Sequence, residues 1–146
     1  MKKILIARKS NLKKDQITVQ GAIVSIKQKN KNDFISLTDI AVRIIKLYKY
    51  LCDEKKEYIL SKQLLRCGTS IGANINEAQA GQSKNDFISK MSIASKEARE
   101  TKYWIDLLVE THYLNISEKY VQSIIHDIEE IIKIITSIVK STQVNK

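Results

Sequence analysis

The stretch from Val121 to Val139, VQSIIHDIEEIIKIITSIV, decides the fold of this chain. Its apolar residues recur three and four positions apart, which is the spacing of one helical face. The stripe is broad enough to face a protein core, so it predicts a long amphipathic helix. Its members are Val121, Ile124, Ile125, Ile128, Ile131, Ile132, Ile135, Ile138 and Val139.

Three earlier segments have the same periodicity. They predict helices over residues 38–52, 58–80 and 84–111. Ser83 to Asp86 resembles a capping box at the start of the third helix, with Asp in place of Glu. Gly81 is placed to end the second helix in a left-handed conformation. Four helices joined by short turns predict an all-α, antiparallel up-and-down four-helix bundle over residues 37–146.

The predicted core faces of the second and third helices follow a heptad rhythm. They comprise Leu60, Leu64, Cys67, Ile71, Asn74 and Ala78, then Phe87, Met91, Ala94, Ala98, Thr101, Ile105 and Leu108.

Size and composition fit one soluble domain. The chain has 146 residues, no proline and 43% apolar residues, and domains commonly hold about 100–150 residues. The longest apolar run, Ile4 to Ala7, is too short for a membrane span or a signal-peptide core. Two cysteines make no disulfide framework. We therefore expect a cytoplasmic protein.

Positive charge is concentrated in the first 36 residues, which form a basic N-terminal extension. This extension carries nine Lys or Arg and two Asp, giving +7, whereas residues 37–146 carry only +2. A basic segment attracts polyanions such as nucleic acid, but it can equally be a solubilising tail. β-Prone residues around Gly21 and at Phe34–Ile35 allow a small β-hairpin here, with part of the extension flexible.

The candidate nucleic-acid contacts are the basic residues of the extension and of the third helix. They are Lys2, Lys3, Arg8, Lys9, Lys13, Lys14, Lys27, Lys29, Lys31, Lys90, Lys96, Arg99 and Lys102.

The sequence predicts no metal site, no cofactor and no enzymatic activity. Neither His112 nor His126 follows a glutamate by three residues, as di-iron bundles require. His126 and Glu130 alone are ordinary helix surface, and Cys52 and Cys67 fall on core faces. A nucleophile elbow and a phosphate-binding glycine loop are both absent from the sequence.

Small residues fill the interior of the second helix from Gly68 to Ala78. Each helical glycine costs about 0.8–1 kcal/mol relative to alanine, so close helix packing is one explanation, with Ala94 and Ala98 as the matching face. The other is a polar network that fixes the bundle or subunit arrangement. Its members would be Arg66, Ser70, Asn74, Glu77 and Arg99.

Several stretches in order resemble the family of 23S rRNA-intervening-sequence proteins, over roughly residues 40–142. They are VRIIKLYKYL (42–51), LSKQLLR (60–66), SIGANINEA (70–78), DFISKMSIA (86–94), KEARET (96–101) and Tyr103-Trp104. The resemblance implies a bacterial four-helix bundle that assembles into a ring-shaped homopentamer and has no catalytic residues. Relatives include the accessory variability determinant of diversity-generating retroelements, which binds nucleic acid and a reverse transcriptase.

The extension has a second, partial resemblance. Residues 17–21 and 34–41 are similar to the opening hairpin and helix start of a KilA-N domain, a phage-type DNA-binding module. We therefore expect a non-enzymatic oligomer that binds RNA, DNA, a ribonucleoprotein or a protein partner such as a reverse transcriptase. The family resemblance implies that the oligomer is a pentamer. The alternative is a structural protein–protein scaffold that binds no nucleic acid.

Overall fold

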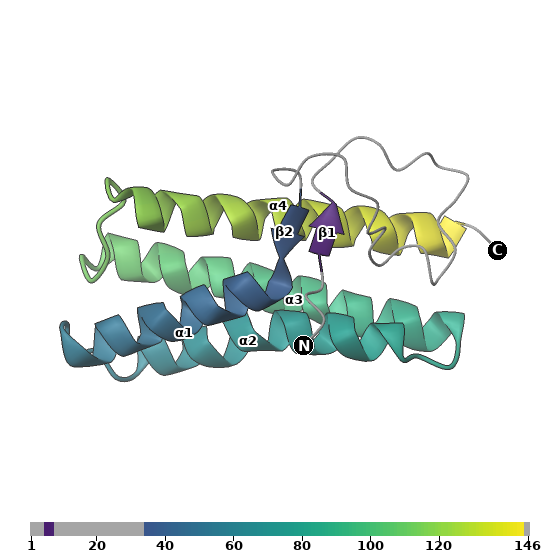
Figure 1. Cartoon of the computed structure of the whole chain (residues 1–146), viewed down its shortest axis with the longest axis horizontal. Helices are drawn as coiled ribbons and strands as arrows, with labels where there is room; N and C mark the ends of the chain where they lie inside the picture. Colours follow the sequence, from purple (N-terminus) through teal and green to yellow (C-terminus); the bar gives the residue numbers. More distant parts are fainter. Residues whose placement is uncertain (1–4, 8–33, 145–146) are drawn as a thin grey trace.

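A computed structural model describes residues 5–7 and 34–144 of the chain. Its four helices lie along the long axis of the molecule and alternate in direction (Figure 1). They are α1 (Leu37–Asp53), α2 (Leu60–Gln79), α3 (Lys84–Glu110) and α4 (Lys119–Val144). The predicted all-α four-helix bundle is confirmed.

Two short strands precede the bundle. β1 (Leu5–Ala7) pairs antiparallel with β2 (Phe34–Ser36), with Ile6 opposite Ile35. The expected strand at Phe34–Ile35 is thus present, and its partner is β1. The β-prone residues around Gly21 lie outside the described residues. β2 runs directly into α1, and β1 contacts α4 (Figure 1).

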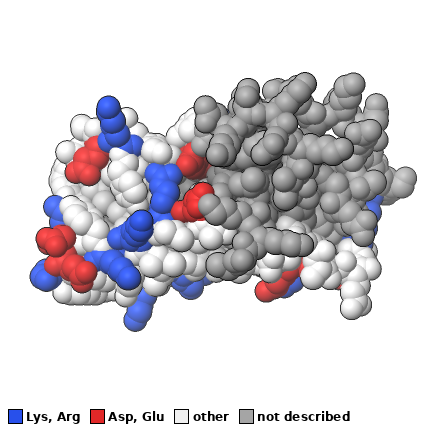
Figure 2. Space-filling model, viewed as in Figure 1, with Lys and Arg blue, Asp and Glu red and all other residues white. Residues whose placement is uncertain are grey.

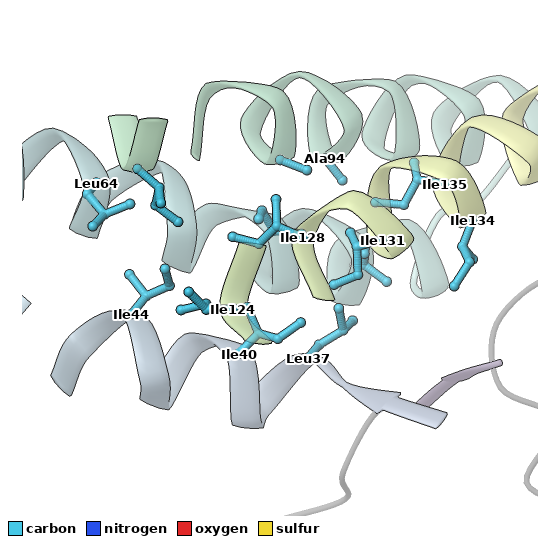
Figure 3. Packing of buried hydrophobic residues seen from close by; sticks show 14 of the residues in the cluster. Leu37, Ile40, Ile44, Leu64, Ala94, Ile124, Ile128, Ile131, Ile134 and Ile135 are labelled. Atoms are coloured by element: carbon cyan, nitrogen blue, oxygen red, sulfur yellow. The ribbon is translucent and has the colours of Figure 1, made fainter. Parts of the chain in front are cut away.

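The core lies between all four helices and is mostly aliphatic, with Phe87 buried in it. Figure 3 shows Ile124, Ile128 and Ile131 of α4 in the core between Ile40 of α1 on one side and Ala94 of α3 on the other. The α4 stripe is buried at Val121, Ile124, Ile128, Ile131, Ile135 and Ile138, with Ile134 added. Ile125, Ile132 and Val139 are half-buried at its edges.

The close approach of α1 and α2 depends on glycine. A Cβ atom on Gly68 would lie 2.7 Å from Cγ2 of Ile44, so either the Ile44 side chain or the helix that carries it would have to shift. One on Gly72 would lie 3.7 Å from Cβ of Leu37, an ordinary contact. The expected matching face, Ala94 and Ala98 of α3, is therefore wrong for these glycines, since their nearest neighbours belong to α1.

Helix ends follow local hydrogen bonding. Ser83 caps α3 as predicted, because its side chain accepts a hydrogen bond of 3.1 Å from the Asp86 N–H. The left-handed ending predicted at Gly81 is wrong: α2 ends in right-handed turns, with the Gly81 N–H donating to the Ala78 oxygen. His112, at φ 65°, supplies the left-handed residue that ends α3.

Candidate functional site

Most of the residues expected to contact nucleic acid belong to the N-terminal extension. The following lie outside the described residues: Lys2, Lys3, Arg8, Lys9, Lys13, Lys14, Lys27, Lys29 and Lys31.

The four remaining basic residues all lie on α3, where Lys90 faces α2, whereas Arg99 and Lys102 face α4. Lys90 forms an ion pair of 2.6 Å with Glu77 of α2. Arg99 donates to the Thr136 hydroxyl of α4 at 3.3 Å. Lys96 is exposed. The four side chains therefore do not form one basic face.

Lys102 is the most strongly paired of these cations. Its Nζ lies 2.7 Å from Asp106 and 3.8 Å from Glu129 of α4. The hydrogen bond with Asp106 raises the pKa of Lys102, against a smaller opposing effect of burial. Basic and acidic side chains are also interspersed on the visible part of the bundle (Figure 2). The positive charge of Lys90 and Lys102 is therefore largely neutralised within the bundle.

Arg66, Ser70, Asn74 and Glu77 lie along one seam between α2 and α3. At one end, Arg66 pairs with Glu97 at 3.5 Å and with Glu100. The hydrogen bond with Glu100 is the main reason that the pKa of Arg66 is raised. At the other end, Glu77 pairs with Lys90.

Two local hydrogen bonds occupy the middle of this seam. The Ser70 hydroxyl donates to the Arg66 carbonyl oxygen at 2.7 Å, and the Asn74 amide donates to the Ser70 carbonyl oxygen at 2.8 Å. Asn74 is half-buried, while Ile75 is buried. The prediction that Asn74 sits on the core stripe is therefore wrong: the helix turns so that Ile75 faces the core.

Arg99 is separate from that seam, because it contacts Thr136 on the α4 side of α3. The predicted five-residue arrangement is thus divided between two helix interfaces. Four of its members share the α2–α3 seam, held by backbone-directed hydrogen bonds and by ion pairs to α3.

An aromatic pair adjoins the Arg66 end of the seam. The Trp104 indole N–H donates to Oε1 of Glu100 at 3.2 Å, and this bond, together with Arg66, lowers the pKa of Glu100. The Tyr103 ring packs edge-on against Trp104, with ring centroids 5.1 Å apart. Tyr103 itself is 55% exposed.

A groove between α1 and α4 was not predicted from the sequence. It has a volume of about 290 Å³ and is lined by Lys46, Leu47, Tyr50, Leu114, Glu118, Tyr120 and Val121. Leu47, Leu114 and Val121 are buried at its floor, whereas both tyrosines are exposed.

Arg43 fixes one wall of this groove. Its guanidinium lies 5.2 Å from the Tyr120 ring centroid, and the Tyr120 hydroxyl donates to the Arg43 carbonyl oxygen at 2.9 Å. Burial raises the pKa of Tyr120, although Arg43 opposes that shift. The guanidinium also forms an ion pair with Asp127, with an Nη1–Oδ2 distance of 2.8 Å. These partners are far apart in the sequence, so no local spacing could indicate them.

Glu57 is a second feature that the sequence analysis missed. Its carboxylate accepts hydrogen bonds from the N–H groups of Ile59, Leu60 and Ser61, at 2.7 to 3.0 Å, and so caps the start of α2. Burial would raise the pKa of Glu57, but the three N–H donors together lower it below its usual value. An acidic residue directly before a predicted helix is the sequence signal that could have found it.

Within 5–7 and 34–144, no three His, Cys, Asp or Glu side chains are grouped as metal ligands would be. In that part of the chain, no helix is both long and apolar enough to cross a membrane. Cys67 is buried as predicted, and Cys52 is half-buried with its sulfur 3.8 Å from the Ser61 hydroxyl.

Comparison with known proteins places the bundle in a family. The family model for 23S rRNA-intervening sequence proteins matches residues 35–137. The match leaves out residues 17–21, the first of the two segments that resemble a KilA-N domain. None of the curated proteins compared with the chain matches it.

A solved structure agrees with this match. It is the crystal structure of a protein with unknown function from the S23 ribosomal protein family of Bacteroides thetaiotaomicron. The two chains are 52% identical with a TM-score of 0.68, and the alignment covers 71% of this chain and 94% of that one. Neither family description indicates an enzyme. The chain therefore belongs to the family of 23S rRNA-intervening sequence proteins.

Proposed function

We propose that this protein is a non-enzymatic, oligomeric scaffold that binds nucleic acid or a ribonucleoprotein through its N-terminal extension. The observation that carries the proposal is the uneven distribution of charge. The first 36 residues carry +7, whereas the bundle carries +2 and pairs Lys90 and Lys102 with its own carboxylates. Electrostatic attraction to phosphates is therefore assigned mainly to the extension, with Lys96 and Arg99 as additional contacts.

Self-association is the second part of the proposal. Large apolar side chains are exposed on the bundle, among them Val42 and Ile45 on α1 and Ile93 and Tyr103 on α3. Apolar surface of this kind often marks a protein contact. A homopentamer is the state that the family resemblance implies. Five copies would present five extensions to one polyanion, which multiplies weak contacts by raising the effective concentration.

The ion pairs of the bundle favour a second candidate function. If the extension does not contact nucleic acid, a nearly neutral bundle with exposed apolar residues fits a scaffold that binds another protein, such as a reverse transcriptase. The location proposed in either case is the cytoplasm of a bacterium.

Nucleic-acid binding separates the two candidates. The test uses the full chain, mixed-sequence RNA and DNA oligonucleotides, and fluorescence anisotropy at several salt concentrations. We expect Lys27, Lys29 and Lys31, changed together to Gln, to weaken binding and to flatten its salt dependence. The slope should fall by about 0.9 for each lost contact with duplex DNA and about 0.7 on single strands.

The matched control changes Lys49, Lys62 and Lys140 to Gln, which removes the same charge from exposed positions on the bundle. Equal losses in the two triple variants would move the binding surface onto the bundle. No binding by the parent protein at low salt would favour the protein scaffold. Light scattering of the parent tests self-association, and a monomer at micromolar concentration would contradict the oligomer.

A further inference from the structure

The groove between α1 and α4 has the properties of a receptor for one apolar side chain. Its floor is buried and aliphatic, and Tyr50 and Tyr120 stand exposed on its two sides. Tyr120 is already held by the hydrogen bond to Arg43 and by the guanidinium on its ring. Filling such a groove buries apolar surface with little additional loss of side-chain freedom at that wall.

Tyr103 is an apolar side chain suited to that groove. It is the most exposed tyrosine of the four helices, at 55%, and its edge-on contact with Trp104 holds the ring. Trp104 is itself fixed by its hydrogen bond to Glu100. A tyrosine held in this way contributes a large contact area at low entropic cost, as anchor residues in protein interfaces do.

The groove and Tyr103 lie on different sides of one bundle. α1 contacts α2 and α4, whereas α3 packs against α2 and α4, so α1 and α3 are diagonal (Figure 1). Tyr103 lies between the buried residues Thr101 and Ile105 along α3, and it therefore points away from the core. One copy cannot place its Tyr103 in its own groove.

Both features lie near the same end of the bundle. Tyr50 is three residues before the end of α1, and Tyr103 is seven residues before the end of α3. At 1.5 Å per residue these positions are roughly 5 and 10 Å from that end. Two copies side by side can therefore bring the tyrosine of one to the groove of the other with only a small axial offset.

Charges around the two features are complementary. Tyr103 has Arg99 one turn before it, whereas Asp106, nearly one turn after it, is paired with Lys102 at 2.7 Å. The groove is lined by Glu118 and Lys46. Arg99 beside the tyrosine and Glu118 at the groove allow opposite charges to meet, which favours a specific register.

We propose that Tyr103 of one copy inserts into the α1–α4 groove of a second copy. Each copy then uses two different surfaces, so the contact is heterologous and its repetition gives a ring if the rotation closes. This inference rests on the self-association included in the proposed function, and it names the residues that would make that contact.

The test uses two full-length variants, each lacking one of the two surfaces. Tyr103→Ala removes the inserted ring, and Tyr50→Asp places a charge at the mouth of the groove. Each variant alone should weaken assembly by at least about 30-fold in dissociation constant, as expected for loss of a central aromatic anchor. Mixed in equal amounts, they should form a 1:1 dimer and nothing larger, because the mixture retains one intact tyrosine and one intact groove.

Tyr58→Ala is the matched control, since Tyr58 is exposed in the α1–α2 turn outside the groove. It should assemble as the parent does, and circular dichroism should show the same helicity in all variants. Parent-like assembly of Tyr103→Ala, or failure of the mixture to form the dimer, would overturn the inference alone. A monomeric parent protein would instead overturn the self-association on which it rests.

Discussion

Arg43 on α1 and Asp127 on α4 form an ion pair with an Nη1–Oδ2 distance of 2.8 Å, although 84 residues separate them in the chain. The same guanidinium donates to the Tyr120 carbonyl oxygen at 3.3 Å. α1 contacts α4 over a smaller surface than it contacts α2. This polar contact therefore connects the first and last helices where apolar packing between them is limited.

We expect Arg43→Met to lower the free energy of unfolding by about 1–3 kcal/mol, because it removes a charged partner from the partly buried Asp127 carboxylate. Urea unfolding followed by circular dichroism measures the loss. In a double-mutant cycle with Asp127→Asn, the two effects should not add. Strict additivity would show that the pair contributes no coupling energy.

Arg66 should matter less to stability, even though it has two carboxylate partners. Its side chain is 51% exposed, whereas that of Arg43 is 22% exposed, and exposed ion pairs contribute about 0–1 kcal/mol. Arg66→Met is therefore expected to cost less than Arg43→Met under the same conditions. Added salt should reduce the Arg66 effect further. The reverse order would mean that solvent does not screen the Glu97 and Glu100 contacts.

The capping carboxylate of Glu57 predicts a component of acid sensitivity. Its pKa is lowered in the folded protein, so its contribution is complete above the ordinary glutamate pKa. That contribution is lost as the pH falls through the lower, folded-state pKa. Glu57→Gln should destabilise the protein at neutral pH and flatten the acid limb of a plot of unfolding free energy against pH. Glu54→Gln, at an exposed neighbouring position, is the control and should leave the plot unchanged.

The two glycines of α2 should respond oppositely to alanine. Gly68→Ala gains helix propensity, but its Cβ would lie 2.7 Å from Ile44, so we expect a net destabilisation of about 1–3 kcal/mol. Gly72→Ala meets only an ordinary contact with Leu37 and should stabilise by about 0.5–1 kcal/mol. Thermal unfolding measures both changes. A stabilising Gly68→Ala would show that the Ile44 side chain, or α1 with it, can make room for the Cβ at little cost.

The helices were predictable because the buried face of a helix is determined by residues three and four positions apart in the sequence. The α4 stripe and the Ser83 cap needed only residues a few positions apart, and both were predicted correctly. Because a helix has 3.6 residues per turn and a heptad pattern assumes 3.5, the pattern drifts from the true core face along a helix. Periodicity then does not decide which of two neighbouring residues is buried. The heptad rhythm placed Asn74 toward the core, yet the 3.6-residue turn of α2 buries Ile75 instead.

Contacts between distant residues were not predictable. The sequence indicated that Gly68 permits close packing, but the partner, Ile44, depends on how two helices cross. The groove is lined by Tyr50 of α1 and Tyr120 of α4, which are far apart in the sequence. The net charge of the extension, in contrast, follows from the sequence alone. The proposed contact with nucleic acid therefore rests on the sequence and not on contacts between distant residues.

The direct junction of β2 and α1 has a geometric consequence for any symmetric assembly. Ser36 ends the strand and Leu37, which is buried, begins the helix with no residue between them. In each subunit, the segment that precedes α1 therefore joins the bundle at one fixed point and in one fixed direction. In a closed ring the entry points would recur at equal angles around the axis, so the subunit packing would set the spacing at which positively charged segments meet a strand of phosphates.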